Sequence, residues 1–249
     1  MASPAHDGWL LYTDHISKSY GATRVLDDIT IGLRPGDVIG LVGPNGAGKT
    51  TLLNILAGMF PPDAGSVWLE DGWVDFDRQP ERRRILGLML GGRLVVEELK
   101  AGEYFEFVAA MYGANGRSAT LVADLVKTLR LDPHMAKQIK NLSAGTKKKV
   151  EYVASVLHSP RILLFDEPFE AIDPPSVADL TAVTLDFVRS TGAAAIISSH
   201  IVPYVRPLAT DTRLLWNGRL YEPSDLEEAL RSRGDDTELS RWRTVLEGA

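Results

Sequence analysis

The chain has 249 residues, 45% of them hydrophobic and 24% charged, which is typical of a globular protein with one large domain or two small ones. Its net charge of −6 argues against nucleic acid as a direct partner, because proteins that bind a duplex usually carry a basic surplus. Cysteine is absent, which excludes disulfides, thiolate metal sites and cysteine nucleophiles.

The front of the chain predicts an antiparallel β portion. Between residues 9 and 42, apolar runs alternate with turn signals such as Ser19–Gly21 and Arg34–Asp37, the pattern of short strands joined by hairpins. Two further strand-like runs, Ser66–Leu69 and Ile85–Leu90, flank a polar segment rich in arginine.

Residues 98–158 predict helices. Apolar residues three and four positions apart form one helical face in each of two segments, namely Leu121, Leu125, Val126 and Leu129, and then Val150, Val153, Ala154 and Leu157. A buried strand (Ile162–Phe165), a helix (Val177–Arg189) and another strand (Ala193–Ser198) follow. This alternation indicates a parallel sheet, so the expected fold class is α/β with a helical insertion in the core.

No apolar run is long enough to cross a bilayer, which takes about 20 residues. The longest candidates, Ile162–Phe165 and Ala193–Ile197, have the length of strands. Residues 1–14 lack the basic start and long apolar core of a signal peptide. A role at a membrane would therefore need another chain to span it.

One segment matches GxxxxGK[ST], the pattern of a phosphate-binding loop; it consists of Gly43, Pro44, Asn45, Gly46, Ala47, Gly48, Lys49 and Thr50. A strand-like run precedes it and a helical pattern, Thr51–Ala57, follows it, as the motif requires. Its glycines let backbone N–H groups point at phosphate oxygens, and the helix directs its positive end at the same anion. We expect a nucleoside triphosphate there, with Lys49 on the β- and γ-phosphates and Thr50 on magnesium. The alternative is an ordinary glycine-rich turn.

Polar side chains follow two of the predicted core strands. Asp166 and Glu167 end the strand that begins at Ile162, where α/β sheets bind ligands. Asp166 is placed to hold magnesium, and Glu167 to orient and activate an attacking water. His200 follows the next strand and could bind the γ-phosphate. The alternatives are a solvated acidic turn and a surface histidine.

A further anion-binding end is possible at Asn141–Thr146, which precedes an amphipathic helix with a serine and small residues. By itself this segment favours a plain helix cap followed by a solvated basic face.

These motifs occur in a fixed order, and in that order the chain resembles the ATP-binding subunit of an ATP-binding-cassette transporter from about Leu11 to Leu220. Gly43–Thr50 is similar to the Walker A loop, and Ile162–Glu167 to Walker B with its catalytic glutamate. Leu142–Thr146 resembles the signature usually written LSGGQ, and Ala171–Asp173 resembles the D-loop.

The resemblance implies a P-loop NTPase fold, with a parallel-sheet core, an N-terminal antiparallel β subdomain and a helical insertion. It places the cassette domain at residues 1–222, with the helical subdomain at about 93–158, and a C-terminal helical tail at residues 223–249.

The resemblance also implies ATP and Mg²⁺ as ligands. Lys49, Glu167 and His200, the switch histidine, would be catalytic, and Thr50 and Asp166 would bind the metal. The implied nucleotide contacts are Tyr20, Gly43–Thr50, Thr51, Ser143, Ala144, Gly145 and Asp173. Tyr20 would stack on adenine, an interaction of about 1–3 kcal/mol in other base-binding proteins; the alternative is a strand-end aromatic in the core.

Members of this family pair head to tail, so Ser143 and Gly145 would contact the ATP of a second cassette, in a homodimer. The pair would drive an integral membrane permease through the helical subdomain, from the cytoplasmic face of the membrane. The segment Leu142–Val150 most resembles those of exporters.

Two other classes compete with a transporter subunit. One is a soluble ATP-binding cassette that acts as a clamp or regulator, but such proteins usually carry two cassettes or a long coiled coil. The other is a P-loop GTPase or small-molecule kinase, but the chain has no Asn-Lys-x-Asp motif and its signature segment would be unexplained.

The chain departs from the family pattern at several positions. Gly92 aligns with a glutamine that links magnesium to the permease, so water or Glu97 would have to substitute for it. Ala144 replaces a signature glycine, where a methyl group makes positive φ unfavourable, and Thr146 replaces a glutamine. Glu170 replaces a small polar residue or asparagine. Pro207 predicts that the helix after His200 is short or kinked.

Overall fold

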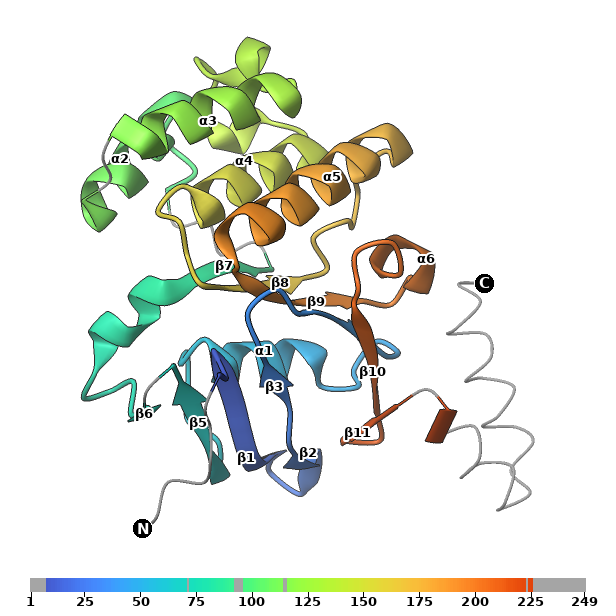
Figure 1. The fold of residues 1–249 in the computed structure, drawn as a ribbon. Helices are drawn as coiled ribbons and strands as arrows, with labels where there is room; N and C mark the ends of the chain where they lie inside the picture. The colour runs from blue at the N-terminus through green and yellow to red at the C-terminus, as the bar shows by residue number, and fades with distance from the viewer. Residues whose placement is uncertain (1–7, 71, 92–95, 114–115, 223, 226–249) are drawn as a thin grey trace.

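The computed structural model describes residues 8–70, 72–91, 96–113, 116–222 and 224–225. Two β-sheets organise this part of the chain (Figure 1). The first is antiparallel with the order β2-β1-β5-β6, and β3 pairs with β1. Its strands are β1 (Leu11–Tyr20), β2 (Thr23–Ile29), β3 (Gly32–Leu33), β5 (Ala64–Leu69) and β6 (Gly72–Trp73). The predicted antiparallel β subdomain is therefore confirmed.

The second sheet has the order β11-β10-β4-β9-β8-β7, and its strands are parallel except for β11. The strands are β4 (Val38–Val42), β7 (Leu86–Leu90), β8 (Ile162–Asp166), β9 (Ala194–Ser199), β10 (Asp211–Trp216) and β11 (Arg219–Tyr221). Buried residues throughout β4, β8 and β9 agree with strands covered on both faces. Because β9 lies between β4 and β8, the carboxyl ends of these three strands meet at one edge.

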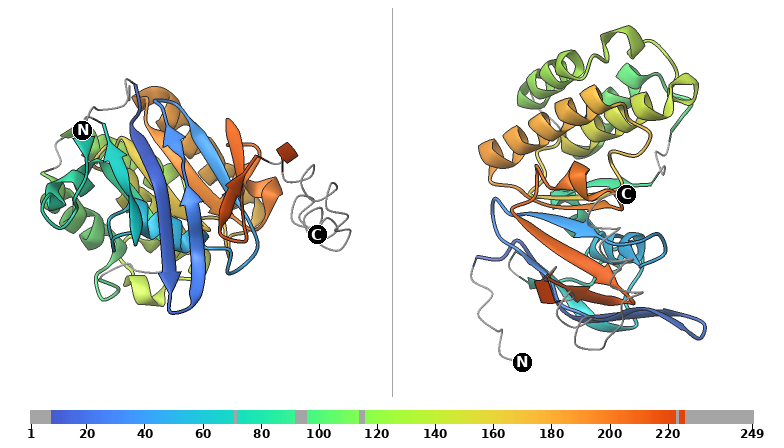
Figure 2. Two further views of the ribbon diagram at one scale, coloured as in Figure 1. Left: turned by 90° about the horizontal axis from the view of Figure 1, so that it is seen from below. Right: turned by 90° about the vertical axis from the view of Figure 1, so that its right-hand side faces the viewer.

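Helices cover both faces of the parallel sheet (Figures 1 and 2). Helix α1 (Lys49–Leu56) lies between the two sheets. Four longer helices lie on the opposite face, namely α2 (Ala101–Tyr112), α3 (Gly116–Thr128), α4 (Ala144–Val156) and α5 (Pro174–Thr191). Short 3₁₀ helices occupy Pro80–Ile85, Asp132–His134 and Ile139–Asn141. The predicted helical insertion between β7 and β8 is confirmed.

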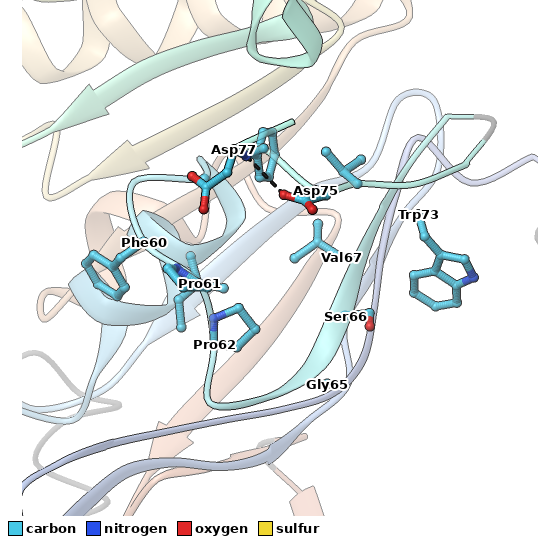
Figure 3. Close-up of a pocket in the computed structure, with 13 residues that line it drawn as sticks. Phe60, Pro61, Pro62, Gly65, Ser66, Val67, Trp73, Asp75 and Asp77 are labelled. Carbon is cyan, nitrogen blue, oxygen red and sulfur yellow. Dashed lines mark hydrogen bonds between the residues drawn. The ribbon is translucent and has the colours of Figure 1, made fainter. Parts of the chain in front are cut away.

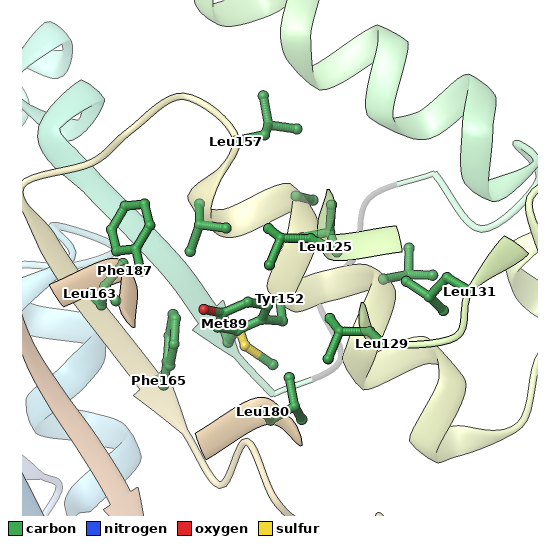
Figure 4. Close-up of a cluster of buried hydrophobic side chains, with 14 of the residues drawn as sticks. Met89, Leu125, Leu129, Leu131, Tyr152, Leu157, Leu163, Phe165, Leu180 and Phe187 are labelled. Atoms are coloured by element: carbon green, nitrogen blue, oxygen red, sulfur yellow. The ribbon is translucent and has the colours of Figure 1, made fainter. Parts of the chain in front are cut away.

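The core on the helical face contains residues from β7, β8 and all four helices (Figure 4). Tyr152 of α4 packs edge-on against Phe165 of β8, with ring centroids 5.9 Å apart. The two predicted apolar faces lie in this core: Leu121 is partly buried, and the other seven residues are buried. Local apolar spacing therefore identified the side of each helix that packs on the sheet.

The helix after His200 is short, as Pro207 predicted. Helix α6 (Val202–Val205) has four residues and ends before the proline. Apart from Ser224 and Asp225, the predicted C-terminal tail lies outside the described residues, as does Gly92.

Candidate functional site

The loop between β4 and α1 requires glycine at three of its positions. Gly46 and Gly48 have φ angles of 80° and 103°, which residues with a side chain rarely adopt. A Cβ atom at Gly43 would lie 2.4 Å from the backbone oxygen of Leu215, so a side chain there would collide with β10. The backbone therefore takes the curled path that phosphate-binding loops share.

Lys49 and Thr50 begin α1 and connect the loop to β8. Lys49 is 6% exposed, and its Nζ donates hydrogen bonds to the backbone oxygens of Gly43 at 2.7 Å and Pro44 at 3.2 Å. The same Nζ lies 3.4 Å from Glu167 Oε1. Thr50 Oγ1 donates to Asp166 Oδ2 at 2.6 Å. A cation and a hydroxyl thus face the two carboxylates that the sequence singled out.

Ser198 of β9 joins the two carboxylate residues. Its hydroxyl donates to Asp166 Oδ1 at 2.6 Å and accepts from the backbone N–H of Glu167 at 2.9 Å. Glu167 has a φ of 47°, an uncommon backbone conformation for a residue with a side chain. Ser198 therefore ties the unusual backbone at Glu167 to the neighbouring strand.

His200 lies at the end of β9, against Glu167. Its backbone N–H donates to Glu167 Oε2 at 3.3 Å, and its Nδ1 is 3.0 Å from the same oxygen, outside good hydrogen-bond geometry. Glu167 Oε1 is buried and has no hydrogen bond among the described residues. The structure therefore brings together Lys49, Thr50, Asp166, Glu167 and His200, which we call the strand-end cluster.

The strand-end cluster fits a triphosphate with a divalent cation. A hydroxyl from α1 and a carboxylate from β8 converge, and such hard oxygen donors are those that Mg²⁺ prefers. Lys49 and the amides of the glycine loop supply positive charge on one side. Glu167 Oε1, buried without a hydrogen bond, is available to a water beside the phosphates.

The signature segment lies at the start of α4. Ser143 caps this helix, because its Oγ accepts from Thr146 N–H at 3.2 Å and lies 2.8 Å from Thr146 Oγ1. A Cβ atom at Gly145 would lie 2.9 Å from the backbone oxygen of Ala171, so the segment packs closely on the predicted D-loop. In the described part of the chain, no hydrogen bond or ion pair joins Ser143 or Gly145 to the strand-end cluster.

The expectation about Ala144 is wrong in one respect. Ala144 is the first residue of α4 and does not have a positive φ. Its methyl group therefore imposes no backbone strain. Glu97, considered as a substitute for the missing glutamine, instead binds Lys147 Nζ at 2.8 Å.

Three predicted contacts remain. Thr51 follows Thr50 in α1 and is half-buried. Among the described residues, no hydrogen bond or ion pair joins Asp173 or Tyr20 to the cluster. Asp173 caps α5, and the hydrogen bonds from Ser176 hold the pKa of its carboxyl below the usual range. Tyr20 ends β1 and is 51% exposed, which excludes the alternative that it packs in the core. Its ring meets Phe60 edge-on, with centroids 6.5 Å apart.

The functional residue that sequence reasoning missed is Ser198. The chain offered only a weak signal, a hydroxyl at the end of an apolar strand two residues before His200. Nothing in that spacing indicates that its side chain reaches Asp166, because the contact depends on β8 and β9 being neighbours.

A cavity of about 470 Å³ lies beside the antiparallel sheet, away from the phosphate loop (Figure 3). Phe60, Pro61, Pro62, Val67 and Trp73 contribute to its wall, together with two aspartates. No residue of the loop or the strand-end cluster lines it. The site defined by chemistry is therefore distinct from this hollow.

Comparison with known proteins agrees with the geometry. A family model described as ABC transporter matches residues 26–170, which is more than half of the chain. The linearmycin resistance ATP-binding protein LnrL of Bacillus subtilis is 27% identical over 92% of this chain and 73% of its own length. The lantibiotic transport ATP-binding protein SrtF of Streptococcus pyogenes is 29% identical over 85% of this chain and 89% of its own.

Solved structures share the fold. An ATP-binding subunit of an ABC transporter superposes with a TM-score of 0.78 and 26% identity, over 96% of this chain and 95% of that one. A dimeric, post-hydrolysis ATP-binding cassette bound to ADP and Pi has a TM-score of 0.76 over 85% of this chain and 98% of that one. At 20% identity, the second likeness shows the fold alone.

Among the described residues, no helix combines the length and apolar character needed to cross a membrane. The phosphate loop, the strand-end cluster and the family match together show that the chain belongs to the ABC transporter family, as an ATP-binding subunit that hydrolyses ATP.

Proposed function

We propose that this chain is one of two cassettes that close around ATP and Mg²⁺ and so power export by a separate membrane permease. The observation that carries the proposal is the convergence of Lys49, Thr50, Asp166, Glu167 and His200 at the ends of β4, β8 and β9. The name of LnrL, which refers to linearmycin resistance, supports the export direction.

Each residue of the cluster has a role that follows from its chemistry. Lys49 would exchange its loop carbonyls for phosphate oxygens, and Thr50 and Asp166 would hold the magnesium ion. When bound, this ion would neutralise charge that develops between the β- and γ-phosphates. Glu167 would accept a proton from the attacking water as general base. His200 would hold the Glu167 carboxylate and contact the γ-phosphate.

A second copy of the chain would complete the site. Ser143 lies exposed at the start of α4, and its described hydrogen bonds stay within its own helix. Its hydroxyl and the amides of Ala144 and Gly145 are therefore free to meet the γ-phosphate of an ATP on a partner cassette. Asp173 would lie beside the same junction, and the exposed ring of Tyr20 would stack on adenine.

The helical subdomain offers a face to the permease. A groove of about 340 Å³ lies between β7, α2 and α4. Its wall includes Met59, Phe107 and Met111, which are large apolar side chains that remain 44%, 44% and 59% exposed. We call this the α2–α4 groove. A permease segment docked there would hold the chain at the cytoplasmic face of the membrane as a peripheral subunit.

The variant Glu167→Gln tests the proposed chemistry. The amide keeps the size of the side chain but cannot accept the water proton, so we expect ATP binding to persist and turnover to fall about 100-fold or more. ATP should also convert this variant to a stable dimer, which size-exclusion chromatography with light scattering would detect. Glu170→Gln, an exposed neighbour, is the matched control and should hydrolyse ATP normally. Unchanged turnover in Glu167→Gln would remove Glu167 from its role.

A further inference from the structure

One carboxylate in the α2–α4 groove has no structural explanation. Glu151 of α4 lines this groove and is 6% exposed, among buried residues of α4. Among the described residues its carboxylate has neither a hydrogen bond nor an ion pair within 4.0 Å. Acidic side chains are almost never buried this deeply unless they are paired.

The described neighbours of Glu151 do not compensate for the burial of its carboxylate. Burial raises the pKa of its carboxyl, and Lys148, one turn earlier on α4, opposes this only in part. Across the groove, burial and then the charge of Glu151 raise the pKa of Tyr104 to about 12, so the phenol stays protonated. In the part of the chain that the structure describes, the other titratable groups near the groove are Tyr112 and His158, whose rings stack 3.8 Å apart, and the exposed Arg84.

The rest of the groove is apolar and accessible. Met59, Phe107 and Met111 form an exposed rim, so an occupant of the groove would bury apolar surface around a single negative charge. Among the described residues no cation lies within 4.0 Å of the Glu151 carboxylate, so a basic side chain of the occupant would supply a complementary charge. A small metal ion fits less well, because one carboxylate supplies too few oxygen donors and the nearest neighbours are aromatic and aliphatic.

We infer that the α2–α4 groove recognises a permease segment with an apolar face that carries one arginine or lysine, and that Glu151 binds this basic side chain. The inference rests on the proposed function, since it names the chemistry of the permease segment. Glu151 would act as a specificity residue. Its charge would lower the affinity of the groove for segments without a cation and raise it for segments that carry one. Removing one partner of such a buried pair costs far more than removing an exposed charge.

Peptides test the inference directly. Four labelled helical peptides of about 16 residues would share one apolar face and differ at a central position, which is Arg, Lys, Gln or Glu. Fluorescence anisotropy with the full-length chain should show that the Arg and Lys peptides bind about tenfold or more tightly than the Gln peptide. The Glu peptide should bind most weakly.

Substitutions identify the residues that cause the preference for basic peptides. Glu151→Gln should abolish the preference for the basic peptides, whereas Glu106→Gln, the same change at an exposed position of α2, should retain it. Phe107→Ala should weaken the binding of all four peptides, because it removes part of the apolar rim. Equal affinities for the Arg and Gln peptides, a preference that survives Glu151→Gln, or no binding by any peptide would overturn the inference. ATP hydrolysis by the same preparation tests the proposed function separately, so a chain with normal turnover and no preference contradicts only this inference.

Thermal unfolding distinguishes recognition from a structural role. A raised pKa means that folding favours the protonated carboxyl, so ionisation of Glu151 destabilises the fold as the pH rises above the ordinary value of 4.5. Glu151→Gln should therefore preserve or raise the melting temperature at neutral pH, with a smaller benefit near pH 4.5. A lower melting temperature at neutral pH would show that Glu151 supports the fold, and would contradict the inference.

Discussion

The hydroxyl of Ser198 positions the two carboxylate residues of the site. Ser198→Ala should therefore impair catalysis, although Ser198 is not one of the predicted phosphate contacts. The hydroxyl donates to Asp166 Oδ1 at 2.6 Å and accepts from Glu167 N–H at 2.9 Å. Alanine removes both hydrogen bonds at a position that is fully buried. The backbone of Glu167, at a φ of 47°, would lose a hydrogen bond that holds it in place.

The expected cost follows from these two interactions. A hydrogen bond to a charged group contributes about 1.5–3 kcal/mol, and a buried N–H without a partner costs about 1–3 kcal/mol. Together they predict a loss of about 2.5–6 kcal/mol in the free energy of unfolding. In a chain of this size that corresponds to a melting temperature lower by about 5–24 °C. Misplacement of Glu167 should reduce kcat about 10- to 100-fold.

Ser199→Ala is the matched control. Ser199 is also buried and makes two hydrogen bonds, but both are with Ile201. Steady-state ATPase assays at saturating ATP should find its kcat within about twofold of wild type, even where stability falls. If Ser198→Ala and Ser199→Ala had the same kcat, Ser198 would be a structural residue, and the positioning role would be refuted.

Three further substitutions test other parts of the molecule. Tyr20→Ala should weaken ATP binding by about 1–3 kcal/mol while the melting temperature stays unchanged, because the ring is exposed; equal affinities in a fluorescent-nucleotide titration would exclude adenine stacking. Gly48→Ala should abolish ATP binding, because φ is 103° and a Cβ atom would lie 3.0 Å from the backbone oxygen of Val25; isothermal titration calorimetry checks this, and normal affinity would contradict it. Gly92→Gln, which supplies the side chain that the family pattern expects, should change the magnesium dependence of ATP hydrolysis; an unaltered dependence would show that the alignment or the assigned role is wrong.

Local patterns predicted many elements of the fold, although the strands β10 and β11 were not among them. The strand expected at Ile162–Phe165 is observed at Ile162–Asp166. The presence of Pro207 correctly predicted that the helix after His200 is short. The phosphate loop was equally predictable, because its requirement for glycine arises within the loop and from the elements on either side of it. Such features depend on backbone geometry and apolar spacing over a few residues, which the sequence displays directly.

Contacts between elements could not be predicted in the same way. Ala144 was expected to strain the signature, but the start of α4 places it in a helical conformation. Glu151 reads as an ordinary charged residue beside an apolar face, and only the packing of α4 against α2 and β7 buries it.

The sequence by itself determined the ligand class, the α/β fold and most members of the site, because each of these rests on a local motif. Tertiary structure decided that Ser198 joins Asp166 to Glu167 and that Glu151 lies in a groove with no hydrogen-bond or ion-pair partner among the described residues. The reason is physical. The order of strands in the sheet brings together side chains that are 32 residues apart in the sequence. Burial makes a carboxylate without a partner costly in free energy. Neither effect leaves a periodic signal along the chain.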